Sequence, residues 1–338
     1  MALSTLQTDH LVSSEKGLSS VSTLILGSKS AVLIDPPFLV PDAKAVVDWI
    51  KKKTSLPLKA VFVTHHHPDH YFSANPILDA FPGAVLYAAP YVCDGIDREY
   101  DDKVKFWPTV FGAENVPAKP TKPTPFHHSL FVLEGNENSP VLLLGPLQGD
   151  SVDHTLFWLP TERTVICGDA VYARSTHLWV EEVETPQLLD AWFKTLDLIE
   201  EGLRPEKVIP GHIEQGWELD AKADLAHARK YLQFFAEKVT YAKKKPGVDE
   251  LYKTFKDAFP QAGKSLITYG ERYLSALMGM QIRTLTSSLA ICRINSGKAG
   301  RSGRRTSITM LVPGRRSSWR RITSLLSAVF DQYSDGTA

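Results

Sequence analysis

Residues 64–70 read Thr-His-His-His-Pro-Asp-His, and they are the most informative stretch of the sequence. They follow directly on an apolar run, LKAVFVT at 58–64, which predicts a short buried strand. Side chains two positions apart in an extended chain point the same way. The spacing therefore predicts that His65 and His67 reach one metal ion together.

The second half of this stretch points to a second metal position. Pro68 is suited to the first turn of a helix, so Asp69 and His70 lie where the chain turns helical. From there they can reach a position beside the first one. A mixture of imidazole and carboxylate ligands suits Zn²⁺, and also Fe or Mn.

Three further candidates lie next to predicted strands. Asp153-His154 precedes the strand signal TLFWLP, Cys167-Gly168-Asp169 ends the apolar run TVICGD, and Pro210-Gly211-His212 ends the run KVIPGH. Folds built from strands and helices place their functional sites at strand ends. Each residue alone is weak evidence, because a single strand-end Asp or His is more often a cap or a core residue. In chain order, the set is strong evidence.

The rest of the chain alternates strand and helix signals, which predicts a layered α/β fold. Strands are predicted at 21–35 (two, around a Gly-Ser turn), 58–64, 84–89, 129–135, 139–147, 155–160, 164–169 and 207–212. Helices are predicted at 42–53, with Asp42 as N-cap, and at 186–201, 217–243, 248–258 and 264–282.

The order HxHxDH, then His, then Asp, then His resembles the motif signature of the metallo-β-lactamase superfamily. The resemblance covers roughly residues 15–270 and implies an αββα sandwich with the site at one sheet edge. It also implies that Asp35, in AVLID, supports the site without binding metal. One departure is that Asp153-His154-Thr155 stands where many members have Gly-His-Thr or Gly-His-Ser.

The same resemblance implies a ligand set for two metal ions. One ion is held by His65, His67 and His154; the other is held by Asp69, His70 and His212; Asp169 bridges the two. Zinc is the expected metal, with two ions per chain, and iron or manganese is an alternative. A metal-bound hydroxide would attack a polarised carbonyl, and Asp69 would orient the nucleophile and shuttle its proton.

The resemblance implies a hydrolase that opens a cyclic amide or ester, a lactam or a lactone, of a small organic compound. Such enzymes act in detoxification or secondary metabolism. Two alternatives stay open: a thioester hydrolase similar to glyoxalase II, and a mononuclear iron persulfide dioxygenase on the same scaffold. A nuclease of the tRNA-processing branch is disfavoured by the charge of the chain.

Two residues after Asp169 are candidates for substrate contacts. The segment VYARSTHLWVEE, at 171–182, resembles a segment of several hydrolases of the superfamily in which a histidine faces substrate. His177 and Tyr172 are the candidates, and a surface role for His177 is the open alternative.

Composition suggests one catalytic domain and a tail. We assign residues 1–285 to the hydrolase domain and interpret 94–125, rich in Asp, Lys and Pro, as a surface insertion forming a lid. Residues 286–338 are rich in Gly, Ser and Arg, which predicts a disordered basic tail.

Charge and cysteine content limit the partners and the compartment. Residues 1–282 carry 28 Lys and Arg against 36 Asp and Glu, so this part is acidic and disfavours a nucleic-acid partner. We find no signal peptide and no apolar run of membrane-spanning length. Three cysteines without CxxC spacing fit a reduced compartment. We therefore expect a soluble cytoplasmic protein with a small-molecule substrate; the oligomeric state stays open.

Overall fold

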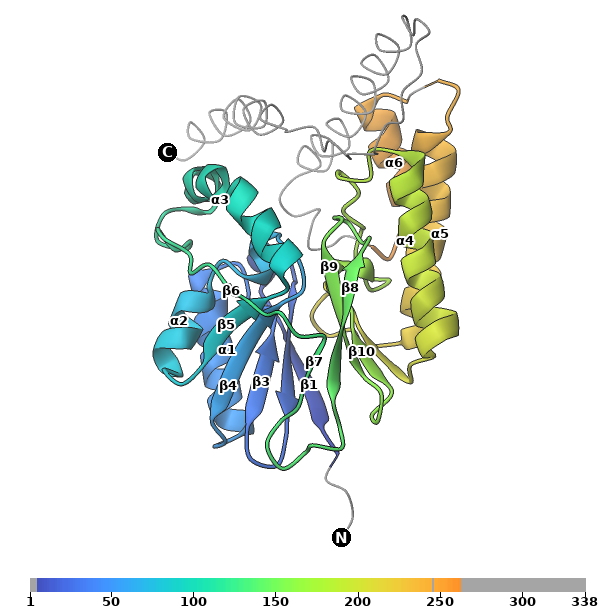
Figure 1. Ribbon diagram of the computed structural model, residues 1–338. Helices are drawn as coiled ribbons and strands as arrows, with labels where there is room; N and C mark the ends of the chain where they lie inside the picture. Colours follow the sequence, from blue (N-terminus) through green and yellow to red (C-terminus); the bar gives the residue numbers. More distant parts are fainter. Residues whose placement is uncertain (1–4, 245, 263–338) are drawn as a thin grey trace, which may run out of the picture. The chain divides into compact units, whose positions relative to one another are not determined.

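Two β-sheets lie face to face, with helices on both outer sides (Figure 1). This arrangement is seen in a computed structural model that describes residues 5–244 and 246–262. It is the predicted αββα sandwich. The predicted helix at 264–282 and the tail at 286–338 lie outside the described residues.

The first sheet has six strands in the order β1-β2-β3-β4-β5-β6. The strands are β1 (Gln7–Val12), β2 (Val21–Leu26), β3 (Ala31–Ile34), β4 (Leu58–Val63), β5 (Val85–Ala88) and β6 (Thr124–Pro125). The first three pair antiparallel, and β3 to β6 pair parallel. Every side chain of β3 is buried, as expected for a strand covered on both faces.

The second sheet has five strands in the order β11-β10-β9-β8-β7. They are β7 (Leu130–Phe131), β8 (Val141–Leu147), β9 (His154–Leu159), β10 (Thr164–Ile166) and β11 (Lys207–Ile209). β10 and β11 are parallel, and the other pairs are antiparallel. The carboxyl ends of β10 and β11 and the start of β9 therefore meet at one edge.

Helices cover the outer face of each sheet (Figure 1). Beside the first sheet lie α1 (Val40–Lys53), α2 (Ala74–Ala80) and α3 (Pro90–Phe111); beside the second lie α4 (Pro186–Asp197), α5 (Ala221–Phe235) and α6 (Val248–Ala258). Short 3₁₀ turns are η1 (Glu15–Gly17), η2 (Pro68–His70) and η3 (Gly168–Ala170), and π-helical turns η4 (Leu198–Leu203) and η5 (Ala236–Thr240) extend α4 and α5.

Local sequence explains where α4 and α5 begin. The Thr185 side chain accepts a hydrogen bond from Leu188 N, and the Asp220 side chain accepts one from Ala223 N. The N-cap predicted for α1 is wrong, because α1 begins one turn earlier with Leu39 as its cap. The Asp42 carboxylate instead accepts hydrogen bonds from Ser14 N and Ser14 Oγ.

The core between the sheets is apolar and rich in aromatic rings. Phe62 of β4 stacks on Phe131 of β7 with ring centroids 4.8 Å apart, and meets Phe157 of β9 edge-on at 5.5 Å. Ile34 and Ile166 belong to the same buried cluster. Burial of this shared face holds the two sheets together, and it fixes the edge where their strands end.

Most of the predicted insertion at 94–125 belongs to a long helix. α3 runs for 22 residues, and its inner face is buried, including Ile96, Phe106 and Trp107. A lid role for this segment stays a prediction. Among the described residues, no helix combines the length and the apolar character needed to cross a bilayer.

Candidate metal centre

The backbone brings the predicted ligands to one edge of the sandwich. The loop after β4 carries His65 and His67, η3 after β10 carries Asp169, and His212 follows β11. His154 opens β9, which runs antiparallel to β10, so it starts at the edge where β10 ends. The hydrogen bond from Thr155 N to Thr64 O, 2.8 Å, ties the two sheets together there.

Four of the predicted ligands form one compact group, Asp69, His70, Asp169 and His212. His212 Nε2 lies 3.2 Å from Asp69 Oδ2 and 3.1 Å from Asp169 Oδ2. His70 Nε2 lies 3.1 Å from Asp169 Oδ1, 3.5 Å from Asp69 Oδ2 and 3.3 Å from His212 Nε2. Four ligands about 2.1 Å from a tetrahedral ion are separated by about 3.4 Å, so these atoms fit such an ion.

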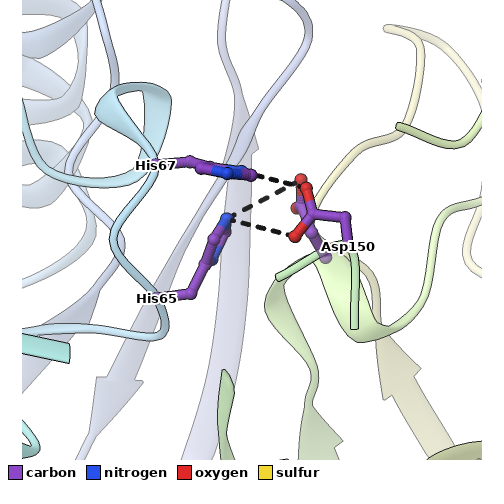
Figure 2. A group of neighbouring side chains, drawn as sticks. His65, His67 and Asp150 are labelled. Atoms are coloured by element: carbon purple, nitrogen blue, oxygen red, sulfur yellow. Dashed lines mark ion pairs between the residues drawn. The ribbon is translucent and has the colours of Figure 1, made fainter. Parts of the chain in front are cut away.

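A second group consists of His65, His67, Asp150 and Asp169. His67 Nδ1 lies 3.0 Å from Asp150 Oδ2, and His65 Nε2 lies 3.8 Å from Asp150 Oδ1 and 3.9 Å from Asp169 Oδ2. Figure 2 shows the two histidines facing Asp150 across the gap between their loops. Asp169 belongs to both groups.

His154 lies beside this second group. Its ring stacks on the ring of His65, with centroids 4.2 Å apart and an angle of 18° between the planes. Its Nε2 lies 3.3 Å from Asp150 Oδ1. The side chain is fully buried.

Each of the five clustered imidazoles has one ring nitrogen committed to an oxygen. The pairs are His65 Nδ1 with Thr64 Oγ1 (3.0 Å), His67 Nε2 with Glu182 Oε1 (3.0 Å), His70 Nδ1 with Asp35 Oδ2 (3.0 Å), His154 Nδ1 with Ser151 O (3.2 Å) and His212 Nδ1 with Leu18 O (2.8 Å). Carboxylate and carbonyl oxygens only accept, and Thr64 Oγ1 already donates its proton to Asp35. Each ring can therefore donate on one side, and its other nitrogen faces the cluster, where it offers a lone pair once it carries no proton.

Buried atoms without partners indicate that the cluster is built for cations. Within the described residues, His65 Nε2, His154 Nε2 and Asp150 Oδ1 are buried and have no hydrogen-bond partner. Leaving such atoms unsatisfied costs about 1–3 kcal/mol each, and more for a charged group. Acceptor atoms that face one another in a buried space require a positive charge between them, so the donor set fits metal ions.

Burial and the neighbouring carboxylates shift the pKa values of the imidazoles in opposite directions. Burial lowers the pKa of His154 to about 4, which keeps this ring neutral. Burial also disfavours the charged form of His67 and His212, but the carboxylates facing them outweigh it and raise both pKa values to about 10. A metal ion must displace protons at these two rings, so its affinity rises with pH.

Asp35 is linked to both ligand groups by hydrogen bonds, to His70 directly and to His65 through Thr64. Its carboxylate accepts hydrogen bonds from Thr64 N, from Thr64 Oγ1 and from His70 Nδ1. It follows β3 in the left-handed conformation, with φ of 58°. This arrangement can fix the tautomer of His70 directly and that of His65 through Thr64, and the supporting role of Asp35 stays a prediction.

We expect Asp35→Asn to weaken metal binding by roughly 10- to 100-fold, because an amide cannot accept from three donors as a carboxylate does. Competition against a chromophoric chelator measures this change. Asp48→Asn, on an exposed turn of α1, is the matched control and should leave the affinity unchanged. Equal affinities for the Asp35→Asn variant and the parent chain would contradict the supporting role.

Tyr172 and His177, the two predicted substrate contacts, lie in different surroundings. Tyr172 is buried at the cluster: its hydroxyl donates toward Asp169 Oδ2 (2.5 Å) and Asp150 Oδ2 (3.0 Å), and its ring stacks on His212. His177 is 3 % exposed, and its Nδ1 lies 3.3 Å from the hydroxyl of Tyr231 on α5. The contacts of His177 are thus with the helical layer rather than with the imidazole cluster. No substrate contact follows for either residue from this geometry.

Sequence reasoning missed three residues that support the ligand loop from α3 and from segment 180–184. Glu182 accepts from His67 Nε2, as described above. Lys103 of α3 is 1 % exposed, and its Nζ lies 2.7 Å from Glu99 Oε2 and 3.3 Å from His66 O. α3 therefore anchors the loop that carries His65 and His67. A Lys four residues after a Glu was the only available signal, and it is common on exposed helices.

Asp150 was also missed. It stands in the loop between β8 and β9, is fully buried, and has no motif spacing to the other ligands. Gly149 before it is needed for packing, because a Cβ there would lie 2.8 Å from the His154 ring. A Gly-Asp pair alone indicates a turn, not a metal site.

Comparison with known proteins gives a family match and several relatives. The family model of the Metallo-beta-lactamase superfamily matches residues 16–212. A hydroxyacylglutathione hydrolase of Francisella philomiragia is 26% identical over 155 residues, which are 46% of this chain and 48% of the relative. One of Gloeobacter violaceus is 36% identical over 62 residues, 18% of this chain and 23% of the relative. The chain thus spans less than half the length of these relatives. A crystal structure of the DIM-1 metallo-beta-lactamase is 19% identical, with a TM-score of 0.47, over 68% of this chain and 92% of that one.

Proposed function

This chain belongs to the metallo-β-lactamase superfamily, and we propose that it is a metal-dependent hydrolase with two ions per chain that cleaves an acyl bond of a small organic compound. One observation carries the proposal: four imidazoles, of His65, His67, His70 and His212, lie with carboxylates in two ligand groups that share Asp169, and His154 lies beside the first of them. Zinc is the metal we propose, with iron or manganese as the alternative.

In this proposal His65, His67 and His154 would hold the first ion, Asp69, His70 and His212 would hold the second, and Asp169 would be a ligand common to both. When bound, two such ions would supply a nucleophile at neutral pH and polarise the carbonyl under attack. Asp69 has a 13% exposed side chain, against 3% for Asp169. The Asp69 carboxylate is therefore more accessible than that of Asp169, and in this proposal it orients the nucleophile and holds its proton.

The first substrate class we propose is a lactam or lactone, in detoxification or secondary metabolism. The second is a thioester, and the names of the relatives, hydroxyacylglutathione hydrolases, favour it. A mononuclear iron persulfide dioxygenase is a weaker candidate, because the group of Asp69, His70, Asp169 and His212 offers four ligands for a second ion.

The test is metal content per chain by elemental mass spectrometry, followed by turnover of the zinc-loaded chain on a panel of lactams, lactones and thioesters. About two zinc ions with hydrolysis of one class support the proposal, and the class hydrolysed identifies the substrate. One iron per chain with oxygen uptake on a persulfide would replace it by the dioxygenase. No metal after reconstitution would contradict both.

A further inference from the structure

We propose that Asp150 is a direct ligand of the first metal ion, in addition to the histidines of that site. This inference rests on the proposed function, since it deepens the same metal centre. It adds one carboxylate to the metal ligands that the sequence motifs predict. Asp150 reaches the centre from the loop between β8 and β9, opposite the loop that carries His65 and His67 (Figure 2).

The distances around Asp150 are those between ligands of one ion. Its Oδ2 lies 3.0 Å from His67 Nδ1, and its Oδ1 lies 3.3 Å from His154 Nε2 and 3.8 Å from His65 Nε2. Ligand atoms at metal–ligand distances of about 2.1 Å are separated by about 3.4 Å in a tetrahedral site, and by similar distances in a five-coordinate one. The carboxylate therefore faces all three histidines at ligand spacing.

Hydrogen bonds within the protein account for only one oxygen of Asp150: its Oδ2 accepts from the Tyr172 hydroxyl and lies 3.0 Å from His67 Nδ1. Asp150 is fully buried, and its Oδ1 has no hydrogen-bond partner among the described residues. The ring nitrogens nearest to this oxygen, His65 Nε2 and His154 Nε2, also have no partner. The other nitrogens of these two rings face Thr64 Oγ1 and Ser151 O, so the free nitrogens turn lone pairs toward the carboxylate. A carboxylate held against lone pairs in a buried space is stable only with a cation between them.

Tyr172 holds the carboxylate in the orientation that a ligand needs. Its hydroxyl bridges Asp150 Oδ2 and Asp169 Oδ2, at 3.0 and 2.5 Å. This contact keeps the two carboxylates on the same side of the centre and leaves Asp150 Oδ1 free. The predicted substrate residue Tyr172 thus acts on the metal ligands in this proposal.

A second buried aspartate of the same loop, Asp153, also has one oxygen without a hydrogen-bond partner among the described residues, but its carboxylate faces different groups. Asp153 Oδ1 accepts from Ser151 Oγ at 2.6 Å and lies 2.8 Å from His66 Nδ1. It faces the support behind the ligand loop rather than the cluster, so it is a matched control for Asp150.

The extra carboxylate affects the chemistry of the centre. Asp150 adds a third negative charge to those of Asp69 and Asp169. It therefore lowers the net positive charge of a site with two divalent ions by one further unit. The centre then attracts anionic substrates less strongly. Neutral acyl compounds are the substrates that such a centre favours relative to anionic ones.

The experiment compares Asp150→Asn and Asp153→Asn with the parent chain, because asparagine keeps the size of the side chain and removes the charge. Zinc per chain is measured by elemental mass spectrometry, and both affinities by competition against a chromophoric chelator. Cobalt-loaded samples report the coordination of the first ion through visible absorption. We expect Asp150→Asn to weaken the first site by roughly 100-fold or more, with the second affinity unchanged and an altered cobalt spectrum. Asp153→Asn should match the parent chain in stoichiometry and spectrum.

Two zinc ions with parental affinities and an unchanged cobalt spectrum in Asp150→Asn would overturn the ligand role of Asp150 and leave the proposed hydrolase intact. Equal losses in Asp150→Asn and Asp153→Asn would also overturn it, since they would show a general effect of the loop. A parent chain without metal is a separate outcome, and it overturns the proposed function itself.

Discussion

Asp169→Ala should lower turnover by roughly 10³-fold or more and should also reduce the metal content of the purified chain. Asp169 is the member common to both ligand groups, with His70 Nε2 and His212 Nε2 each at 3.1 Å. Losing it would remove a ligand from both of the proposed ions, and metal ions supply several kcal/mol of transition-state stabilisation. Turnover on the identified substrate, together with metal content by elemental mass spectrometry, measures the effect.

The matched control is Asp79→Ala, an exposed carboxylate on α2, which should leave turnover and metal content unchanged. Circular dichroism should show the same secondary structure in both variants, since neither side chain belongs to the apolar core. Parental turnover in a clean Asp169→Ala preparation would exclude the bridging role.

Trp192→Ala should destabilise the fold by about 3–5 kcal/mol, because it removes a fully buried indole from between α4 and the second sheet. The indole has a second role at the site, since its Nε1 donates to Ala170 O at 2.9 Å. That bond fixes η3, the turn that carries Asp169. Urea unfolding followed by fluorescence of the remaining tryptophans and by circular dichroism measures the free energy of unfolding.

Trp192→Phe distinguishes packing from the hydrogen bond. It keeps most of the buried ring and loses the donor, so it should cost less than the alanine variant. If alanine costs no more than phenylalanine, the packing explanation is wrong. A metal affinity that falls in both variants would show that the bond to Ala170 O holds the ligand turn in place.

The strands and the first ligand pair could be predicted from local sequence. Every strand predicted within the described residues is present, because runs of apolar residues report burial over a few neighbouring positions. The His65 and His67 spacing reports side-chain direction over two positions of extended chain, and both rings do face the cluster. The order of motifs added the fold, through the family resemblance.

The surroundings of His177 could not be predicted from the local sequence. Its sequence surroundings resemble a substrate-facing segment, but its ring is buried against Tyr231, which lies 54 positions further along the chain. Burial also lowers the pKa of His177 to about 4, as in an apolar environment. The direction of a loop side chain depends on which helix packs over it, and a local pattern carries no information about that.

The sequence by itself determined the sandwich fold, the edge at which the site lies and the histidines around it, because these follow from short-range spacing and from the order of motifs. Only the tertiary structure decided that Asp150, Glu182 and the α3 pair Glu99 and Lys103 join them. Glu182 is 115 positions from His67, and Lys103 of α3 is 37 positions from His66. Side chains that converge from such distances are brought together by the packing of the two sheets and their helices, and that packing depends on the whole chain.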